Sequence, residues 1–322
     1  MSRRCLLGAV FAILALPPLA ALGEALWFHA HNRNNGRLVS SGEAREYLLY
    51  VPTSYVPGRP APLVISLHGG GSWPALQRDI SLWNELADEH GFLVVYPKGH
   101  ALMRTRAALW RVMRSREELD KDVRFIADLI GELRARYAVD ARRIYVNGLS
   151  NGAAMTYVLS CTLSDRVAAV GLVAAAHMLP WSWCEDRRPV PIISFHGTED
   201  EAVPYEGGPS RVHWVPERYV FPHAGEWARN WAARNRCVPE AEETKVATDV
   251  TRRQYGGCAG GASVVFFTVH GGGHTWPGGA ALPRWFLGHT TRGVDASREM
   301  WRFFQAHPLA TAERGAGRGS SP

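Results

Sequence analysis

A serine framed by two glycines is the residue in this sequence with the clearest potential for chemistry. The motif Gly148-Leu149-Ser150-Asn151-Gly152 follows the apolar run Ile144-Tyr145-Val146 and opens an alanine-rich stretch. A strand, a sharp turn and a helix in this order are typical of a nucleophile elbow, where glycines let two backbones approach and lift the serine hydroxyl clear of a sheet. Ser150 is therefore the candidate nucleophile. The alternative is a serine that only caps a helix.

A serine hydroxyl is a weak nucleophile at neutral pH, so it needs a general base and a carboxylate that orients the base. In hydrolases with such an elbow, the acid and then the histidine follow the serine, each on a loop after a strand. Asp200 and His274 occupy such positions, and Glu199 and His270 are the alternatives. His270 ends its run directly, whereas His274 stands beyond three glycines on a loop able to reach Ser150. The sequence favours Asp200 and His274, although an aspartate there could also only cap a turn.

A glycine run supplies candidates for an oxyanion hole. His68-Gly69-Gly70-Gly71 follows the apolar run Val64–Leu67. Such a loop presents backbone N–H groups to the developing alkoxide, together with the N–H of the residue after the nucleophile. The predicted donors are Gly70 or Gly71, and Asn151. The alternative is a flexible turn.

These motifs stand at the ends of alternating strand and helix patterns. Short β-branched or aromatic runs predict strands at Glu46–Val51, Leu63–Leu67, Phe92–Tyr96, Arg143–Asn147, Val167–Val173, Pro191–Phe195 and Val264–Val269. Helical patterns lie at Ile80–His90, Leu119–Tyr137, Asn151–Cys161, Gly225–Asn235 and Asp295–His307. Several strand runs are apolar throughout, as expected when helices cover both faces of a parallel sheet. The pattern predicts a three-layer α/β fold with a mostly parallel central sheet.

Two long stretches fit the alternation poorly, Lys98–Arg116 and Glu201–His223, and long loops in compact domains are often functional. We expect the substrate cleft to be rimmed by Trp73, Trp276 and the aromatic stretch His213–Phe221. Aromatic walls suit flat acyl groups and sugar faces. The alternative is that these side chains only pack a lid.

The composition is that of a globular protein. In 322 residues, hydrophobic side chains are 46% and charged side chains 20%, which argues against a coiled coil, collagen or wholesale disorder. The net charge is +6 and the basic residues are scattered, so nucleic-acid binding is not expected. We predict a signal peptide at 1–25, one α/β domain at 26–308 and a disordered tail at 309–322.

The N-terminus has the build of a secretory signal peptide. Arg3 and Arg4 precede an apolar run from Cys5 to Leu22, and small residues follow up to Ala25. An uncleaved membrane anchor is the alternative, but the run is short and a proline pair interrupts it. We therefore expect a secreted or periplasmic protein with no stable membrane association after cleavage.

Export would leave an even number of cysteines, in a compartment where disulfides persist: Cys161, Cys184, Cys237 and Cys258. Three connectivities are possible. We favour the sequential pairing, Cys161 with Cys184 and Cys237 with Cys258, because it closes two short loops. Four free thiols are the alternative, and no cysteine or histidine spacing predicts a metal site.

Taken together, the motifs resemble those of the secreted polyhydroxybutyrate depolymerase and feruloyl esterase-like family of α/β hydrolases. The matching stretches are Pro62-Leu-Val-Ile-Ser-Leu-His-Gly-Gly, Gly91-Phe-Leu-Val-Val-Tyr-Pro-Lys-Gly, Gly148-Leu-Ser-Asn-Gly-Ala, His196-Gly-Thr-Glu-Asp, Val203-Pro-Tyr and Gly272-Gly-His-Thr-Trp-Pro-Gly-Gly. The resemblance covers roughly residues 47–307. It implies Ser150 as nucleophile, His274 as base and Asp200 as the orienting acid, and it supports the sequential disulfides.

The predicted function is a secreted serine carboxylesterase that works through an acyl-enzyme, without metal or organic cofactor. The expected substrates are soluble polyester oligomers or hydroxycinnamoyl and acetyl esters of polysaccharides. No linker or polymer-binding domain follows His307, so we expect poor attack on crystalline polyester. The alternatives are a peptidase or thioesterase on the same triad, and a non-catalytic polymer-binding protein.

Overall fold

The computed structural model describes residues 30–101, 107–176, 188–216 and 219–310. The predicted signal peptide lies outside the described residues, as does most of the tail predicted at 309–322. Leu309 lies inside them, and its backbone N–H donates to the carbonyl of Arg142 over 2.8 Å. The chain therefore stays in contact with the sheet beyond the predicted boundary at 308. Among the described residues, no helix is both long and apolar enough to cross a membrane.

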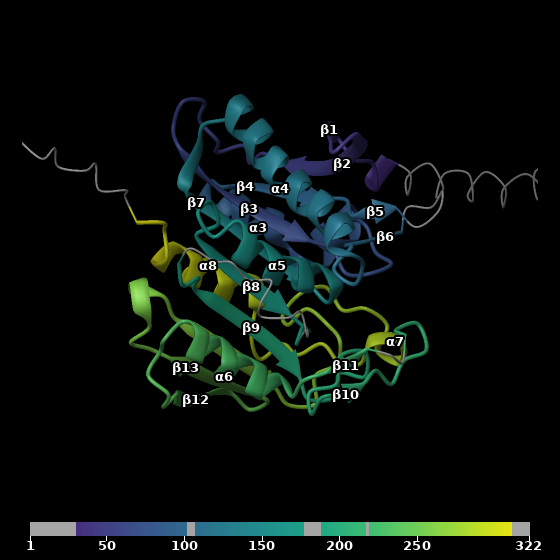
Figure 1. Cartoon of the computed structure of the whole chain (residues 1–322), viewed down its shortest axis with the longest axis vertical. Coiled ribbons are helices and arrows are strands. Elements are labelled where there is room, and N and C mark those ends of the chain that lie inside the picture. The colour runs from purple at the N-terminus through teal and green to yellow at the C-terminus, as the bar shows by residue number, and fades with distance from the viewer. Residues whose placement is uncertain (1–29, 102–106, 177–187, 217–218, 311–322) are drawn as a thin grey trace, which may run out of the picture.

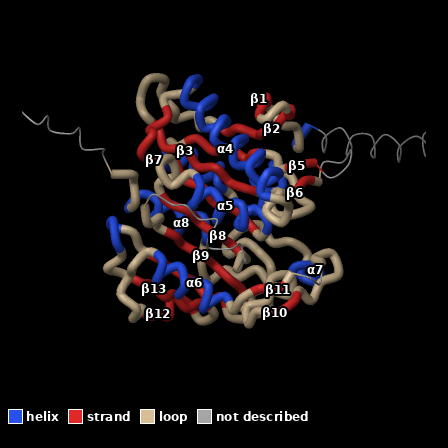
Figure 2. Tube along the Cα trace, in the orientation of Figure 1, coloured by secondary structure: helices blue, strands red, loops and turns tan. Residues whose placement is uncertain are grey.

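One ten-stranded sheet runs through the molecule, from β1 at one end to β12 at the other (Figures 1 and 2). Its spatial order is β1-β2-β4-β3-β7-β8-β9-β14-β13-β12. The central strands pair in parallel: β4 Leu93–Pro97, β3 Ala61–Leu67, β7 Val139–Leu149, β8 Ala169–Val173, β9 Ile192–Gly197 and β14 Val264–Val269. Antiparallel strands extend both sides: β1 Gly36–Ser40, β2 Glu43–Tyr50, β13 Val250–Tyr255 and β12 Glu242–Ala247.

Every predicted strand run corresponds to a strand of this sheet, so those predictions are confirmed. The strands β1, β12 and β13, which lie at or near the sheet edges, were not predicted from the sequence. Their charged and polar side chains give no apolar run to find; β12, for instance, is exposed along nearly its whole length. Charged side chains on an edge strand discourage pairing with other chains. The same side chains break the apolar pattern by which a strand is recognised in the sequence.

Helices cover both faces of the sheet, as predicted. Strand residues alternate between two buried clusters; for example, Ile65 belongs to one and Val64 to the other. The first cluster is completed by α4 Arg116–Arg136, α5 Asn151–Thr162 and α6 Ala224–Arg234. The second is completed by α2 Pro74–Ser81, α3 Trp83–His90 and α8 Ala296–Ala306.

The helix predicted at Ile80–His90 is wrong in its boundaries, because two helices occupy this part of the chain. Leu82 between them has φ +57°, in the left-handed region, and its N–H donates to the carbonyl of Arg78. This geometry ends α2 and redirects the chain into α3. The leucine gave no signal of a break, because glycine or asparagine is the usual residue in that conformation.

The described parts of the two irregular stretches lie beyond one edge of the parallel sheet. The first holds the short hairpin of β5 His100–Ala101 and β6 Ala108–Leu109, and the second holds β10 Gly208–Pro209 and β11 Val220–Phe221. Both hairpins, and the short helix α7 Arg284–Leu287, lie on the side toward which the arrowheads of β3 and β9 point (Figure 1). Ligands of open α/β sheets bind at this carboxyl edge.

Candidate active site

Ser150 stands on the sharp turn that the sequence predicts, directly between β7 and α5. Its backbone has φ +54° and ψ −119°, and its N–H donates to the carbonyl of Val173 over 2.9 Å. A non-glycine residue in such a conformation costs on the order of 1–3 kcal/mol. A Cβ on Gly148 would lie 2.5 Å from the carbonyl carbon of Gly152, so only glycine fits there. The turn is therefore a tight elbow that projects Ser150 from the sheet edge.

Asp200 and His274 are in direct contact, although 74 residues separate them in the chain. Nδ1 of His274 lies 2.8 Å from Oδ2 and 3.0 Å from Oδ1 of Asp200. Oδ1 of Asp200 also accepts the backbone N–H groups of Ala202 and Val203, over 2.9 and 2.8 Å. Because an ionised carboxylate only accepts hydrogen bonds, Nδ1 of His274 carries the hydrogen. Nε2 of the neutral ring is then left with the lone pair that a general base needs.

Asp200 is held in its ionised form. Burial of the carboxyl would raise its pKa, but the electrostatic interactions with the His274 and His196 rings and the hydrogen bonds from His274 and the Val203 N–H outweigh this, and the pKa is lowered. His196 was not predicted. It is fully buried, its Nε2 donates to the Val203 carbonyl over 2.8 Å, and it lies 3.6 Å from Oδ2 of Asp200. Its signals in the sequence were its place at the end of a strand and in the stretch His196-Gly-Thr-Glu-Asp, which matches the family.

The rival residues lie apart from this pair. The Glu199 side chain is exposed, and only its backbone N–H contributes, donating to the carbonyl of Gly272 over 2.8 Å. His270 is also exposed, and its Nε2 lies 3.0 Å from Oγ1 of Thr251 on β13. The geometry thus supports the choice of Asp200 over Glu199 and of His274 over His270.

The glycines before His274 let its loop fold back over the end of β9. A Cβ on Gly197 would lie 2.2 Å from the carbonyl oxygen of Gly272, so the two backbones are in close contact. The N–H of His274 donates to the carbonyl of Leu287 over 2.7 Å. Ser150, Asp200 and His274 therefore share the carboxyl edge of the sheet. In the part of the chain that the structure describes, Ser150 Oγ makes no hydrogen bond to His274; without substrate, such contacts are often long and tighten in the complex.

Only one of the two predicted glycine donors is available. The Gly71 N–H donates to the carbonyl of Ala108 over 2.9 Å, so it is already used. The N–H groups of Gly70 and Asn151 have no acceptor among the described residues. A Cβ on Gly70 would lie 3.3 Å from Cβ of Asn151, so the two residues are neighbours. Gly70 and Asn151 therefore form the candidate oxyanion hole, and Gly71 fixes the loop.

Trp276 does not form the cleft rim that the sequence analysis predicted. Its side chain is 2% exposed, lies in the second core cluster and donates its indole N–H to Oγ of Ser297 over 3.0 Å. The indole N–H of this buried tryptophan therefore has a hydrogen-bond partner inside the protein, as expected in a core. Trp73 is partly buried and donates to Oδ1 of Asn32 over 2.6 Å.

An exposed aromatic patch lies next to His274 instead, formed by Trp214, Trp285 and Phe286. These side chains are 43%, 87% and 48% exposed. The rings of Trp214 and Phe286 lie 4.9 Å apart, and those of Trp285 and Phe286 lie 5.8 Å apart. Leu287, the next residue of α7, accepts the N–H of His274. Trp214 belongs to the aromatic stretch predicted from the sequence, whereas Trp285 and Phe286 were not predicted, although two adjacent aromatics in a Pro- and Gly-rich stretch could have marked them.

The predicted disulfide between Cys237 and Cys258 is present. Cys161 is also disulfide-bonded, and its predicted partner Cys184 lies outside the described residues.

The fold and the arrangement of the site define an α/β hydrolase. The solved structure of an acetyl xylan esterase from Aspergillus awamori matches with a TM-score of 0.56, covering 81% of this chain and 94% of that chain at 16% sequence identity. The fold class predicted from the sequence is therefore confirmed.

Sequence comparison identifies the family. The model of the family described as esterase PHB depolymerase matches residues 45–178, which include the elbow and the glycine loop. "Putative esterase NocK" of Nocardia uniformis is 30% identical over 75% of this chain and 73% of its own length. This chain belongs to the esterase PHB depolymerase family, as its motifs predicted.

Two further relatives are longer proteins. The bifunctional acetylxylan esterase/xylanase XynS20E of Neocallimastix patriciarum is 28% identical over 73% of this chain and 31% of its own length. Feruloyl esterase B of Piromyces equi is 30% identical over 71% of this chain and 42% of its own length. The chain thus spans less than half the length of each.

Proposed function

We propose that the protein is a secreted serine carboxylesterase that hydrolyses its substrate through an acyl-enzyme. The observation that carries the proposal is the buried contact between Asp200 and His274, at the same sheet edge as Ser150 on its tight elbow. A histidine oriented by a carboxylate, beside a serine on such a turn, is the arrangement that acyl transfer requires. Membership of an esterase family supports the same reaction class.

Each group has a defined role in this mechanism. Nε2 of His274 takes the Ser150 hydroxyl proton while Oγ attacks the ester carbonyl carbon, and the carbonyl oxygen becomes an oxyanion. The N–H groups of Gly70 and Asn151 bind that oxyanion. His274 then gives its proton to the alcohol oxygen as the bond between carbon and oxygen breaks. Water repeats the sequence on the acyl-enzyme and releases the carboxylic acid. Asp200 stabilises the imidazolium that forms in both halves.

Turnover and labelling of Ser150 test this function directly. The wild-type protein should hydrolyse 4-nitrophenyl acetate and form a 1:1 adduct with a fluorophosphonate, which mass mapping should place on Ser150. The Ser150→Ala variant should lose both properties and keep its circular dichroism spectrum, because the change opens no large cavity. Turnover by a folded Ser150→Ala variant would refute the nucleophile assignment. Amide and thioester substrates, tested in parallel, would expose a peptidase or thioesterase.

For the substrate, we propose soluble short-chain, acetyl or hydroxycinnamoyl esters, including those carried by polysaccharides. The aromatic patch beside His274 supports this class, because exposed indole faces stack on flat acyl groups and sugar rings. The relatives named as acetylxylan and feruloyl esterases point the same way. Hydrolysis of methyl ferulate and acetylated xylan should exceed that of crystalline polyhydroxybutyrate. Faster clearing of the crystalline polymer would overturn this choice.

Secretion is proposed from the N-terminal sequence and the disulfide between Cys237 and Cys258. Disulfides persist in oxidising compartments and are rare in the cytosol. N-terminal sequencing of exported protein should begin near residue 26. A protein that keeps its full N-terminus in the membrane fraction would instead indicate an anchor.

A further inference from the structure

The segment Ala108–Arg111 braces both halves of the oxyanion hole. On the glycine-loop side, the Ala108 carbonyl accepts the Gly71 N–H and the Ala108 N–H donates to the Ser72 carbonyl, each over 2.9 Å. The indole N–H of Trp110 donates to the carbonyl of His68 over 3.0 Å. The segment is therefore tied to the loop both before and after Gly70.

The same segment is tied to Asn151, the residue that follows the nucleophile. Oδ1 of the Asn151 side chain accepts the backbone N–H of Trp110 over 2.6 Å, and Nδ2 donates to the backbone carbonyl of Trp110 over 3.2 Å. The amide thus pairs with both polar groups of one residue, which fixes the rotamer of Asn151. Asn151 is the first residue of α5, where the N–H groups have no partner within the helix. A side chain locked at this point limits how the first turn can tilt.

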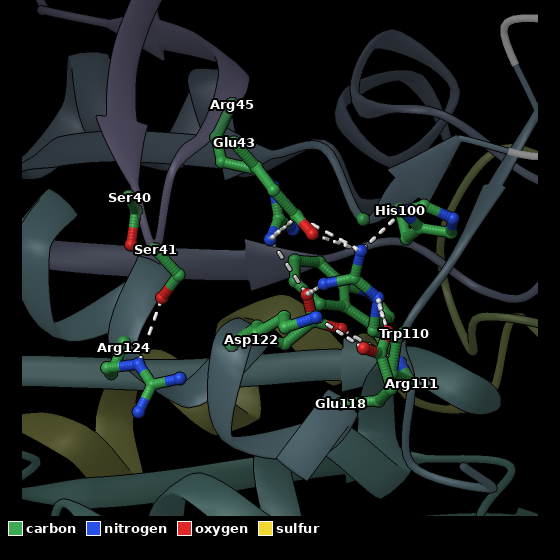
Figure 3. Close-up of polar contacts among 12 residues, drawn as sticks. Ser40, Ser41, Glu43, Arg45, His100, Trp110, Arg111, Glu118, Asp122 and Arg124 are labelled. Atoms are coloured by element: carbon green, nitrogen blue, oxygen red, sulfur yellow. Dashed lines mark hydrogen bonds and ion pairs between the residues drawn. The ribbon is translucent and has the colours of Figure 1, made fainter. Parts of the chain in front are cut away.

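Arg111 anchors the segment to α4 through a buried cluster of charges. Its backbone N–H donates to Oδ2 of Asp122 over 2.8 Å, while Oδ1 of Asp122 accepts Nη1 of Arg45 over 2.8 Å. Glu43 receives Nη2 of Arg111 on both carboxylate oxygens, over 2.9 and 3.0 Å, and Glu118 lies 3.3 Å from Nε. Figure 3 shows these carboxylates gathered around the Arg111 guanidinium.

The cluster is buried enough to act as a rigid support. Asp122 is fully buried, and Arg111 and Arg45 are 2% and 5% exposed. Buried charges are tolerated only when their partners are in place, and loss of one partner leaves an uncompensated charge in a medium that solvates it poorly. The arrangement around Arg111 therefore resists displacement, and so does the Trp110 peptide beside it.

We propose that the Asn151 side chain, Trp110 and the Asp122–Arg111 pair form a positioning device that sets the spacing of the Gly70 and Asn151 N–H groups. Asn151 would then serve twice: its backbone donates to the oxyanion and its side chain aims that donor. The inference rests on the proposed esterase mechanism. Donors that are fixed before the reaction favour the transition state over the bound ester, so loosening them lowers kcat and leaves KM little changed.

The Asn151→Ala variant tests the brace, because it keeps the backbone donor and removes both contacts to Trp110. We expect kcat on 4-nitrophenyl acetate to fall about tenfold to a hundredfold, with KM within about threefold of the wild type. Affinity for a boronic acid that forms a tetrahedral, anionic adduct on Ser150 should fall in parallel with kcat/KM. A role limited to folding would not produce that parallel loss.

Asn235→Ala is the matched control. Asn235 is fully buried and its amide donates to the carbonyl of Val190 over 2.8 Å, just before β9 begins, at the opposite edge of the sheet. Its loss should lower the melting temperature and leave kcat within about twofold. An equal loss of kcat in both variants, or a normal kcat in Asn151→Ala, would overturn the positioning role.

Asp122→Asn provides a second route if Asn151→Ala does not fold. It removes one charge from the cluster without touching Ser150 or either donor, and we expect a kcat loss of about twofold to tenfold with an unchanged KM. A wild-type kcat in the folded variant would contradict the inference. Failure of the inference is distinguishable from failure of the proposed function, because in the latter case Ser150→Ala would also retain turnover.

Discussion

The acid–base half of the site and the oxyanion half are built in different ways. At the ends of β9 and β14, the proposed acid and base, Asp200 and His274, would act through their own side chains, and two contacts of 2.8 and 3.0 Å join them. At the ends of β3 and β7, the proposed oxyanion donors are the backbone N–H groups of Gly70 and Asn151, and the side chains around them would act indirectly. An acid and a base can be recognised by residue type. A backbone donor cannot be recognised in this way, because its position depends on all the contacts that hold the chain in place.

Replacement of His274 should have the largest effect, because this half has no substitute for its base. We expect His274→Ala to lower kcat on the order of 10⁴- to 10⁶-fold, and Asp200→Asn by about 10⁴-fold, since the histidine loses its orienting partner. Steady-state kinetics on folded variants would measure both. His270→Ala should keep nearly full activity, and a comparable loss there would reverse the assignment of the base.

Acidification should lower the stability of the fold through buried histidines in both halves of the site. Burial lowers the pKa of His68 to about 4, and neutral His68 braces the glycine loop by accepting the Gly99 N–H on Nε2 over 3.0 Å. Between pH 6.5 and about 4 the unfolded chain binds a proton that the folded protein does not, so stability falls as pH falls through this window. The loss at its acid end should be about 3 kcal/mol. His196, whose pKa burial also lowers, acts in the same direction.

Urea unfolding between pH 7 and pH 4.5 would measure this loss of stability. A urea midpoint that stays constant over this range would show that the expected contribution of His68 to stability is wrong.

Gly152→Ala should damage the oxyanion half through the backbone. A Cβ at this position would lie 2.4 Å from the carbonyl oxygens of both His68 and Leu67, which are main-chain atoms that cannot turn aside. We expect a loss of about 1–3 kcal/mol in the free energy of unfolding, or more. Gly131→Ala, within α4, meets no atom within 4 Å and should stabilise by about 0.5–1 kcal/mol. If the two variants had equal free energies of unfolding, the result would contradict the close backbone contact at Gly152.

Trp285→Ala should have the smallest effect and should change neither the acid–base half nor the oxyanion half of the site. The side chain is 87% exposed, so the melting temperature should stay the same. Without the indole face, kcat/KM on methyl ferulate should fall by about threefold to tenfold, mostly through a higher KM, whereas kcat/KM on methyl acetate should stay the same. An equal change on both esters would show that the aromatic patch does not bind the acyl group.

The sequence alone determined the central strands, and it was enough to propose Ser150, Asp200 and His274 as the catalytic residues. Apolar runs mark buried parallel strands, and glycines and charged residues at their ends carry a local signature, so neither needs knowledge of distant contacts. The same logic wrongly placed Trp276 at the cleft, because an aromatic residue close in sequence to the proposed catalytic histidine gives the same pattern whether it faces the cleft or the core.

Only the tertiary structure decided which groups hold the proposed oxyanion donors in position. Gly70 and Gly71 are equivalent in sequence, and a hydrogen bond from Gly71 to Ala108 separates them. The contacts of Asn151 with Trp110, and of Arg111 with Asp122 and Glu43, join residues from four parts of the chain. Each of these residue types is common and carries no pattern of its own. Its role arises because burial forces every polar group to find a partner, and the fold alone determines which partners are within reach.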